Sequence, residues 1–119
     1  MLYYEFNTND KTYKLRLNTR NIIALEKKLG QNPLTIFFPG GKINSKDETE
    51  YTLPSVEAMV SILHYSLQQY QHNISFADTE EIFDKWIEEK HTVTDFLPIV
   101  TEIFKVSGIF AEGEEKEKN

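Results

Sequence analysis

The chain has 119 residues, no cysteine and a net charge of −6, and 39% of its residues are apolar. This composition is typical of one folded domain and excludes a disulfide framework or a thiolate site. The charge is uneven, because residues 1–46 hold eight Lys and Arg against three acids, whereas residues 47–119 hold five Lys against sixteen acids. Such asymmetry fits either contact with a charged partner or two separately solvated faces.

The N-terminal segment predicts a β-hairpin over residues 2–17. Two runs, 2–6 and 12–17, alternate apolar and polar residues around a polar turn. The apolar side chains of the second run share one face, so Lys14 and Arg16 are expected to point to water. An isolated hairpin is marginally stable and has open edges, so we expect packing on helices and self-association with a second copy.

A first helix is predicted over residues 18–30. Asn18 is a strong N-cap, and Leu17 with Ile22 has the spacing of a hydrophobic staple. Two lysines occupy the last turn, where they suit the helix dipole, and Gly30 provides a left-handed stop. Since cap, staple and stop agree, the local sequence specifies both ends of this helix.

An apolar segment over residues 34–38 predicts one or two helical turns that end at a Pro-Gly-Gly break. These side chains either close one end of the core or form an exposed patch that binds a protein partner. The polar residues 39–52 that follow are expected to form a mobile loop. The candidate partner-binding residues are Leu34, Ile36, Phe37 and Phe38.

Three further helices are predicted, over residues 54–71, 78–91 and 94–107. A proline opens the first of them. Asp78 opens the second, with Glu81 at capping-box spacing. The apolar stripe expected to bury the first of these helices consists of Val56, Met59, Val60, Leu63, Leu67 and Tyr70.

These elements predict an α+β, helix-dominant fold in which an N-terminal β-hairpin precedes about four helices. The expected domain organisation is a single domain over residues 1–111. Residues 112–119 are charged or small and predict a disordered acidic tail.

The search for reactive groups gives no catalytic site. The carboxylates of residues 78–89 fit the solvated face of a helix, and residues 39–42 lack the spacing of a phosphate-binding loop. We therefore expect no enzymatic activity, no cofactor and no metal. The histidines, which do not have chelating spacing, are His64, His72 and His91.

Nucleic acid and membranes are also disfavoured as partners. The basic N-terminal half could contact phosphates, but a pI near 5.0 and acidic helices would repel them. The apolar runs are far shorter than the roughly 20 residues of a membrane helix, and the first ten residues do not resemble a signal peptide. The expected location is the cytoplasm.

Three short motifs resemble the start of the tail assembly chaperones of long-tailed bacteriophages and prophages of Gram-positive bacteria. They are Tyr-Lys-Leu-Arg-Leu-Asn-Thr-Arg at 13–20, Leu-Glu-Lys-Lys-Leu-Gly at 25–30 and Asn-Pro-Leu at 32–34. The resemblance covers residues 10–40 and carries no catalytic residue.

The resemblance implies a non-catalytic protein of the host cytoplasm that binds the tape measure protein and keeps it in solution during tail assembly. Such proteins are displaced as tail tube subunits arrive, and they are absent from the mature virion. Many are also made as a longer, frameshifted product. Two alternatives stay open, a small structural head–tail connector or tail component, and a DNA-binding regulator.

Overall fold

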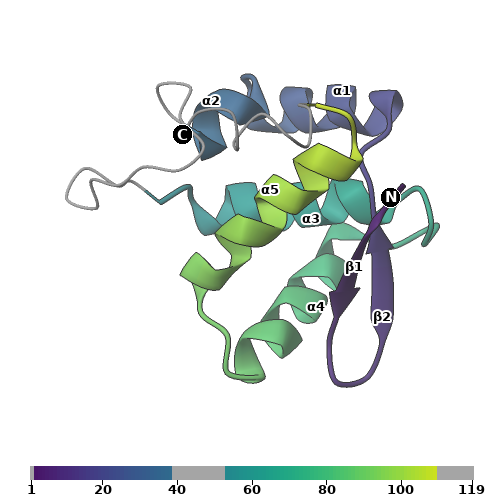
Figure 1. The fold of residues 1–119 in the computed structure, drawn as a ribbon, viewed down its shortest axis with the longest axis vertical. Coiled ribbons are helices and arrows are strands. Elements are labelled where there is room, and N and C mark those ends of the chain that lie inside the picture. The colour runs from purple at the N-terminus through teal and green to yellow at the C-terminus, as the bar shows by residue number, and fades with distance from the viewer. Residues whose placement is uncertain (1, 39–52, 110–119) are drawn as a thin grey trace.

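A computed structural model describes residues 2–38 and 53–109 of the chain (Figure 1). Within these ranges a two-stranded antiparallel hairpin is followed by helices, which confirms the predicted α+β, helix-dominant class. The predicted mobile loop over 39–52 and the predicted tail over 112–119 lie outside the described residues. The elements are β1 (Tyr4–Asn7), β2 (Thr12–Leu15), α1 (Thr19–Leu29), α2 (Pro33–Phe37), α3 (Val56–Leu67), α4 (Phe76–Glu88), the 3-10 turn η3 (Val93–Asp95) and α5 (Phe96–Val106).

The hairpin buries one face against the helices. Phe6 of β1 and Leu15 of β2 are fully buried, as the alternation predicts. The prediction for Arg16 was wrong, because its side chain is half-buried and its guanidinium donates to the backbone oxygens of Leu2 and Val106. Val106 is the last residue of α5, so this arginine joins the end of the hairpin to the C-terminal end of that helix.

The outer edge of β2 is also covered. The backbone amide of Arg16 donates to the carbonyl of Ser66 at 2.9 Å, and the amide of Lys14 donates to the side chain of Gln71 at 2.8 Å. Both partners come from the end of α3 or just beyond it. The prediction that the hairpin has open edges is therefore wrong for the β2 side.

Helix α1 forms as the sequence predicts. The side chain of Asn18 accepts from the amide of Asn21 at 2.9 Å, and Gly30 ends the helix with φ of +76°. Leu25 is fully buried and faces the core. Because its cap and stop are local, this helix needs few distant contacts to define its ends.

Helix α2 directs the apolar segment after Gly30 into the core. Phe37 is 7% exposed and Phe38 is 9% exposed, and both rings meet the ring of Phe104 edge-on, at 6.2 and 5.8 Å between centres. Leu34 and Ile36 are partly buried against the same core. The structure thus corrects the expectation of an exposed patch at Phe37 and Phe38 and supports the other interpretation, that they close one end of the core.

Helix α3 is the central element of the core. It packs against β2, α1, α4 and α5, and eight of its twelve residues are buried. Ser55 caps it by accepting from the amide of Ala58 at 3.0 Å. Val56 departs from the predicted apolar stripe, because it is 50% exposed at the first turn. This exposed valine borders the groove described below.

Helix α4 begins two residues before the predicted start at Asp78. The N-cap is Ser75, whose hydroxyl accepts from the amide of Asp78 at 2.9 Å, while the Asp78 carboxylate accepts from the amide of Ser75 at 3.1 Å. Asp78 is thus the third residue of the capping box, and Phe76 becomes the first residue of the helix. Likewise the predicted helix over 94–107 divides into η3, capped by Thr92, and α5.

Candidate functional site

A groove of about 520 Å³ runs between the first turns of α3 and the first three turns of α4. Its floor is apolar and its rim carries three carboxylates. Helices α3 and α4 pack against each other, and α4 is drawn below α3 in Figure 1. The lining residues are Val56, Glu57 and Val60 of α3, and Phe76, Glu80, Phe83 and Asp84 of α4.

Helical periodicity brings these side chains to one line. Phe76, Glu80, Phe83 and Asp84 have the spacing i, i+4, i+7 and i+8, which places them on one face of α4. Phe83 is buried, Phe76 is half-buried and the two carboxylates are exposed. The capping box at Ser75 makes this possible, since a helix that started at Asp78 would not include Phe76.

The groove is strongly acidic. Glu57, Glu80 and Asp84 are exposed on its rim. Helix α4 as a whole carries five acidic residues and one lysine. Exposed carboxylates beside an apolar floor favour a ligand that is both apolar and positively charged.

One cation from α1 already contacts this groove. The ammonium of Lys28 lies 3.6 Å from a carboxylate oxygen of Glu57 and 4.9 Å from the centre of the Phe76 ring. Both partners line the groove. The arrangement combines an ion pair with a cation–π contact. Lys28 itself is not a lining residue, but it contacts two residues that are, so a cation lies beside the groove on the side of α1.

His64 lies behind the Phe76 ring. The two rings meet edge-on with 5.5 Å between centres, and His64 Nδ1 is 3.1 Å from the hydroxyl of Thr79. Burial lowers the pKa of His64, and the positive charge of Lys28 lowers it further. The lowered pKa favours the neutral form of this imidazole, which contacts the Phe76 ring.

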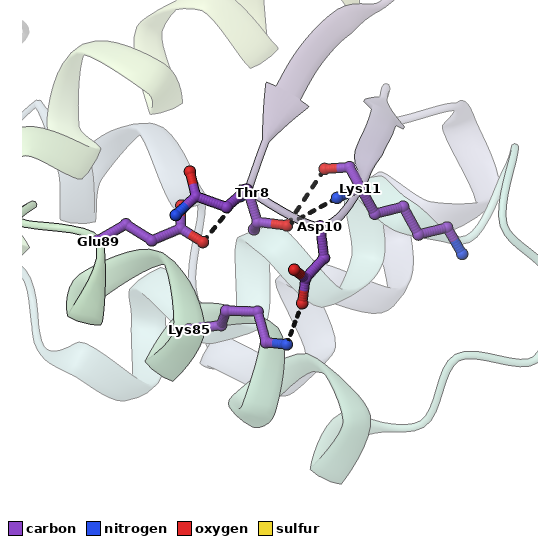
Figure 2. A network of polar contacts seen from close by, with 6 residues as sticks. Thr8, Asp10, Lys11, Lys85 and Glu89 are labelled. Carbon is purple, nitrogen blue, oxygen red and sulfur yellow. Dashed lines mark hydrogen bonds and ion pairs between the residues drawn. The ribbon is translucent and has the colours of Figure 1, made fainter.

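A second charged region joins the hairpin turn to the far side of α4 (Figure 2). Asp10 in the turn forms an ion pair with Lys85, and the Asp10 carboxylate raises the pKa of the Lys85 ammonium. The amide of Asn9 donates to the carboxylate of Glu89 at 2.8 Å. Asp10 and Lys85 pair with each other and Glu89 accepts from a backbone amide, so the network fastens the hairpin turn to the C-terminal part of α4.

The four predicted partner-binding residues do not meet at one surface. Leu34 lines an apolar pocket of about 200 Å³ together with side chains of α1 and α5. Phe37 and Phe38 point into the core instead. Leu34 and Ile36 are partly buried against the core that contains Phe37 and Phe38, and none of the four lines the groove between α3 and α4.

The groove residues were not proposed as a site from the sequence. Glu80 and Asp84 were interpreted only as part of a solvated acidic face. The available signal was the pattern Ser75-x-x-Asp78, which fits a capping box as well as the pattern Asp78-x-x-Glu81 does. Choosing the earlier cap would have placed Phe76 on α4, one turn from Glu80 and two from Asp84.

The described ranges, 2–38 and 53–109, contain neither a cluster of metal ligands nor a helix that could span a membrane. No group of three or more His, Asp or Glu side chains there could hold a metal ion, and the three histidines lie in separate surroundings. None of the helices in those ranges is both long and apolar enough to cross a membrane.

Comparison with known protein families gives a match over most of the chain. A family model described as "Family of unknown function (DUF6096)" matches residues 5–119. No curated protein and no solved structure matches the chain.

Proposed function

The chain belongs to the DUF6096 family of unknown function, and from that premise we propose that it is a non-catalytic protein that binds a helix of a partner in the groove between α3 and α4. The observation that carries this proposal is the composition of the groove. An apolar floor supplies the area for binding, and the carboxylate rim of Glu57, Glu80 and Asp84 supplies orientation.

The size and position of the groove support a helical ligand. Phe76 and Asp84 are eight residues apart on α4, which corresponds to about 12 Å along the helix axis. A partner helix lying along this line would present two to three turns to the floor. Val56 is 50% exposed at the edge of the floor and would be covered by such a helix.

We further propose, from the resemblance over residues 10–40, that the partner is the tape measure protein and that the chain is a tail assembly chaperone. A tape measure protein is a long helical protein, so it offers the kind of segment that the groove suits. In this role the acidic rim would also keep the complex in solution. The tail tube protein is a second candidate partner.

The alternative of a DNA-binding regulator has less support. Lys14, one of its basic candidates, lies over the rings of Tyr3 and Tyr70, and Lys28 pairs with Glu57. The acidic face of α4 would also repel phosphates. The alternative of a structural head–tail connector or tail component differs from a chaperone mainly in whether the protein remains in the virion.

A co-purification experiment tests the proposal. Tagged protein is co-expressed with the tape measure protein from the same gene cluster, and the variant Val56→Asp is compared with Ile23→Asp. Ile23 is the matched control, since it is 46% exposed on α1 and does not line the groove. We expect Val56→Asp to reduce capture at least about tenfold and Ile23→Asp to leave it unchanged.

Three results would contradict the proposal. Equal loss of capture in both variants would show that the groove has no special role. Detection of the protein in purified virions would favour the structural component over the chaperone. A gel shift with the DNA of the gene cluster at physiological salt and micromolar protein would favour the regulator.

A further inference from the structure

We propose that the groove between α3 and α4 recognises a Lys or Arg side chain of the partner helix, and that Lys28 occupies this position in the unbound protein. The inference rests on the proposed helix-binding function and specifies the chemistry of the partner. The partner is a basic amphipathic helix, with an apolar face for the floor of the groove and cationic side chains for its rim.

The first observation that supports this inference is the contact that Lys28 makes. Its ammonium lies 3.6 Å from the Glu57 carboxylate and over the Phe76 ring, 4.9 Å from the ring centre. Lys28 remains partly exposed and Glu57 largely so. Exposed ion pairs of this kind are weak, so a cation from a partner can replace Lys28 at little cost.

The second observation is the position of the other two carboxylates on the rim of the groove. Glu80 and Asp84 follow Phe76 along the same face of α4, one and two turns further on. Within residues 2–38 and 53–109, ion pairs join Lys28 to Glu57, Lys85 to Asp10 and Lys105 to Glu102. Glu80 and Asp84 thus extend the cation-binding rim beyond the reach of Lys28.

The spacing of the rim specifies the partner. Two carboxylates one helical turn apart fit two cationic residues one turn apart on a facing helix. An acidic or neutral amphipathic helix would cover the same floor but would leave these carboxylates unpaired or facing like charges. The groove should therefore discriminate between helices by charge as well as by apolar area.

Two synthetic helical peptides test this inference on the full-length protein. Both carry the same leucine face; one has lysines flanking it and the other has glutamates at the same positions. Binding is measured by fluorescence anisotropy at physiological salt. We expect the lysine peptide to bind at least about tenfold more tightly than the glutamate peptide. The double variant Glu80→Gln/Asp84→Asn should remove most of this difference.

A second double variant controls for net charge. Glu81→Gln/Glu88→Gln removes the same charge from α4, but neither residue lines the groove. It should keep the preference for the lysine peptide. If both pairs of substitutions weaken the lysine peptide equally, the attraction is a general effect of charge and the inference is wrong.

The role of Lys28 is tested by a variant and a matched control. Lys28→Ala should tighten binding of the lysine peptide by about threefold or more, because it frees Glu57 and Phe76. Lys27→Ala removes the same charge from the adjacent residue of α1 but leaves the contacts of Lys28 with Glu57 and Phe76 in place, and it should change binding less than about twofold. Weaker binding in Lys28→Ala would overturn the assignment of Lys28 as an internal competitor.

Failure of this inference can be distinguished from failure of the proposed function. If the two peptides bind equally and Val56→Asp abolishes both, the groove binds helices but does not select cations, so only the inference fails. If neither peptide binds, the groove is not a helix-binding site, and the proposed function fails with the inference.

Discussion

The side-chain amide of Gln71 forms two hydrogen bonds with the backbone of Lys14. The Lys14 amide donates to Gln71 Oε1 at 2.8 Å, and Gln71 Nε2 donates to the Lys14 carbonyl at 2.9 Å. A neighbouring β-strand would use the same two backbone groups. Gln71 therefore takes the place of a third strand on the outer edge of β2. Self-association of the protein stays a prediction, but this edge is not open for it.

Replacing Gln71 should open that edge. In Gln71→Ala the amide and carbonyl of Lys14 lose their partners, so we expect stability to fall by about 1 kcal/mol and self-association to increase. Light scattering over a wide concentration range measures the mass. His72→Ala is the control, because His72 is the exposed next residue. An unchanged mass in Gln71→Ala would mean that the amide does not protect the edge.

Ser61 offers a stabilising substitution. Its side chain is fully buried in α3, and its hydroxyl oxygen has no hydrogen-bond partner among the described residues. Ser61→Ala should raise the free energy of unfolding by roughly 0.5–1 kcal/mol, because an unpaired buried hydroxyl is costly and alanine favours the helix. Denaturant titration provides the measurement.

Ser66 is the matched control for this substitution. It is equally buried in the same helix, but its hydroxyl donates to the Leu63 carbonyl at 3.0 Å. Ser66→Ala should therefore gain less stability than Ser61→Ala, or lose some. The same change in both variants would show that helix propensity alone explains the effect.

Phe37 and Phe38 should behave as core residues. Since both rings pack against Phe104, we expect Phe37→Ser/Phe38→Ser to destabilise the protein by about 3 kcal/mol or more, with a clear fall in Tm. Thermal unfolding followed by circular dichroism tests this. Leu2→Ser is the control, because Leu2 is 67% exposed. A nearly unchanged Tm in the double variant would restore the partner-patch interpretation.

The lowered pKa of His64 makes stability depend on pH. The unfolded protein binds a proton at this residue near pH 6.5, whereas the folded protein binds it only at lower pH. The contribution of His64 to stability should therefore be fully present above pH 6.5. It should be lost as the pH falls from 6.5 towards the pKa of the folded state. Denaturant titrations from pH 5 to pH 8 measure this, and His64→Gln should remove this contribution.

Lys28 provides an independent test of the same pKa. Its charge is the second cause of the shift after burial, so Lys28→Ala should raise the pKa of His64 towards its ordinary value. An NMR titration of the imidazole measures the change directly. Lys27→Ala should have a smaller effect. Equal shifts in the two variants would indicate that Lys28 does not lie beside His64 in solution.

The sequence predicted the elements whose signals are local. Asn18 and Gly30 define α1 because a cap and a stop act on the nearest backbone groups. The start of α4 differs from the prediction because Ser75 and Asp78 both suit an N-cap, and the capping box of the structure uses Ser75 as the cap.

The groove could not be predicted in this way. It is lined by side chains of two helices, α3 and α4, and Lys28 of a third helix contacts Glu57 and Phe76 beside it. Periodicity assigns a residue to the buried or the polar face of its own helix, but it does not specify which helix lies opposite. Val56 illustrates this limit, since it matches the apolar stripe of α3 and yet lies at the exposed edge of the groove.

The burial of α3 also determines how the protein can be divided. The hairpin, α1, α4 and α5 all place apolar side chains against this one helix, including Leu15 and Leu25. A fragment that ends before Val56 would leave those side chains in water, and one that begins after Leu67 would lose the surface on which α4 and α5 rest. Neither half should fold when it is produced separately. A fragment that contains the groove between α3 and α4 should therefore also need the hairpin and α1.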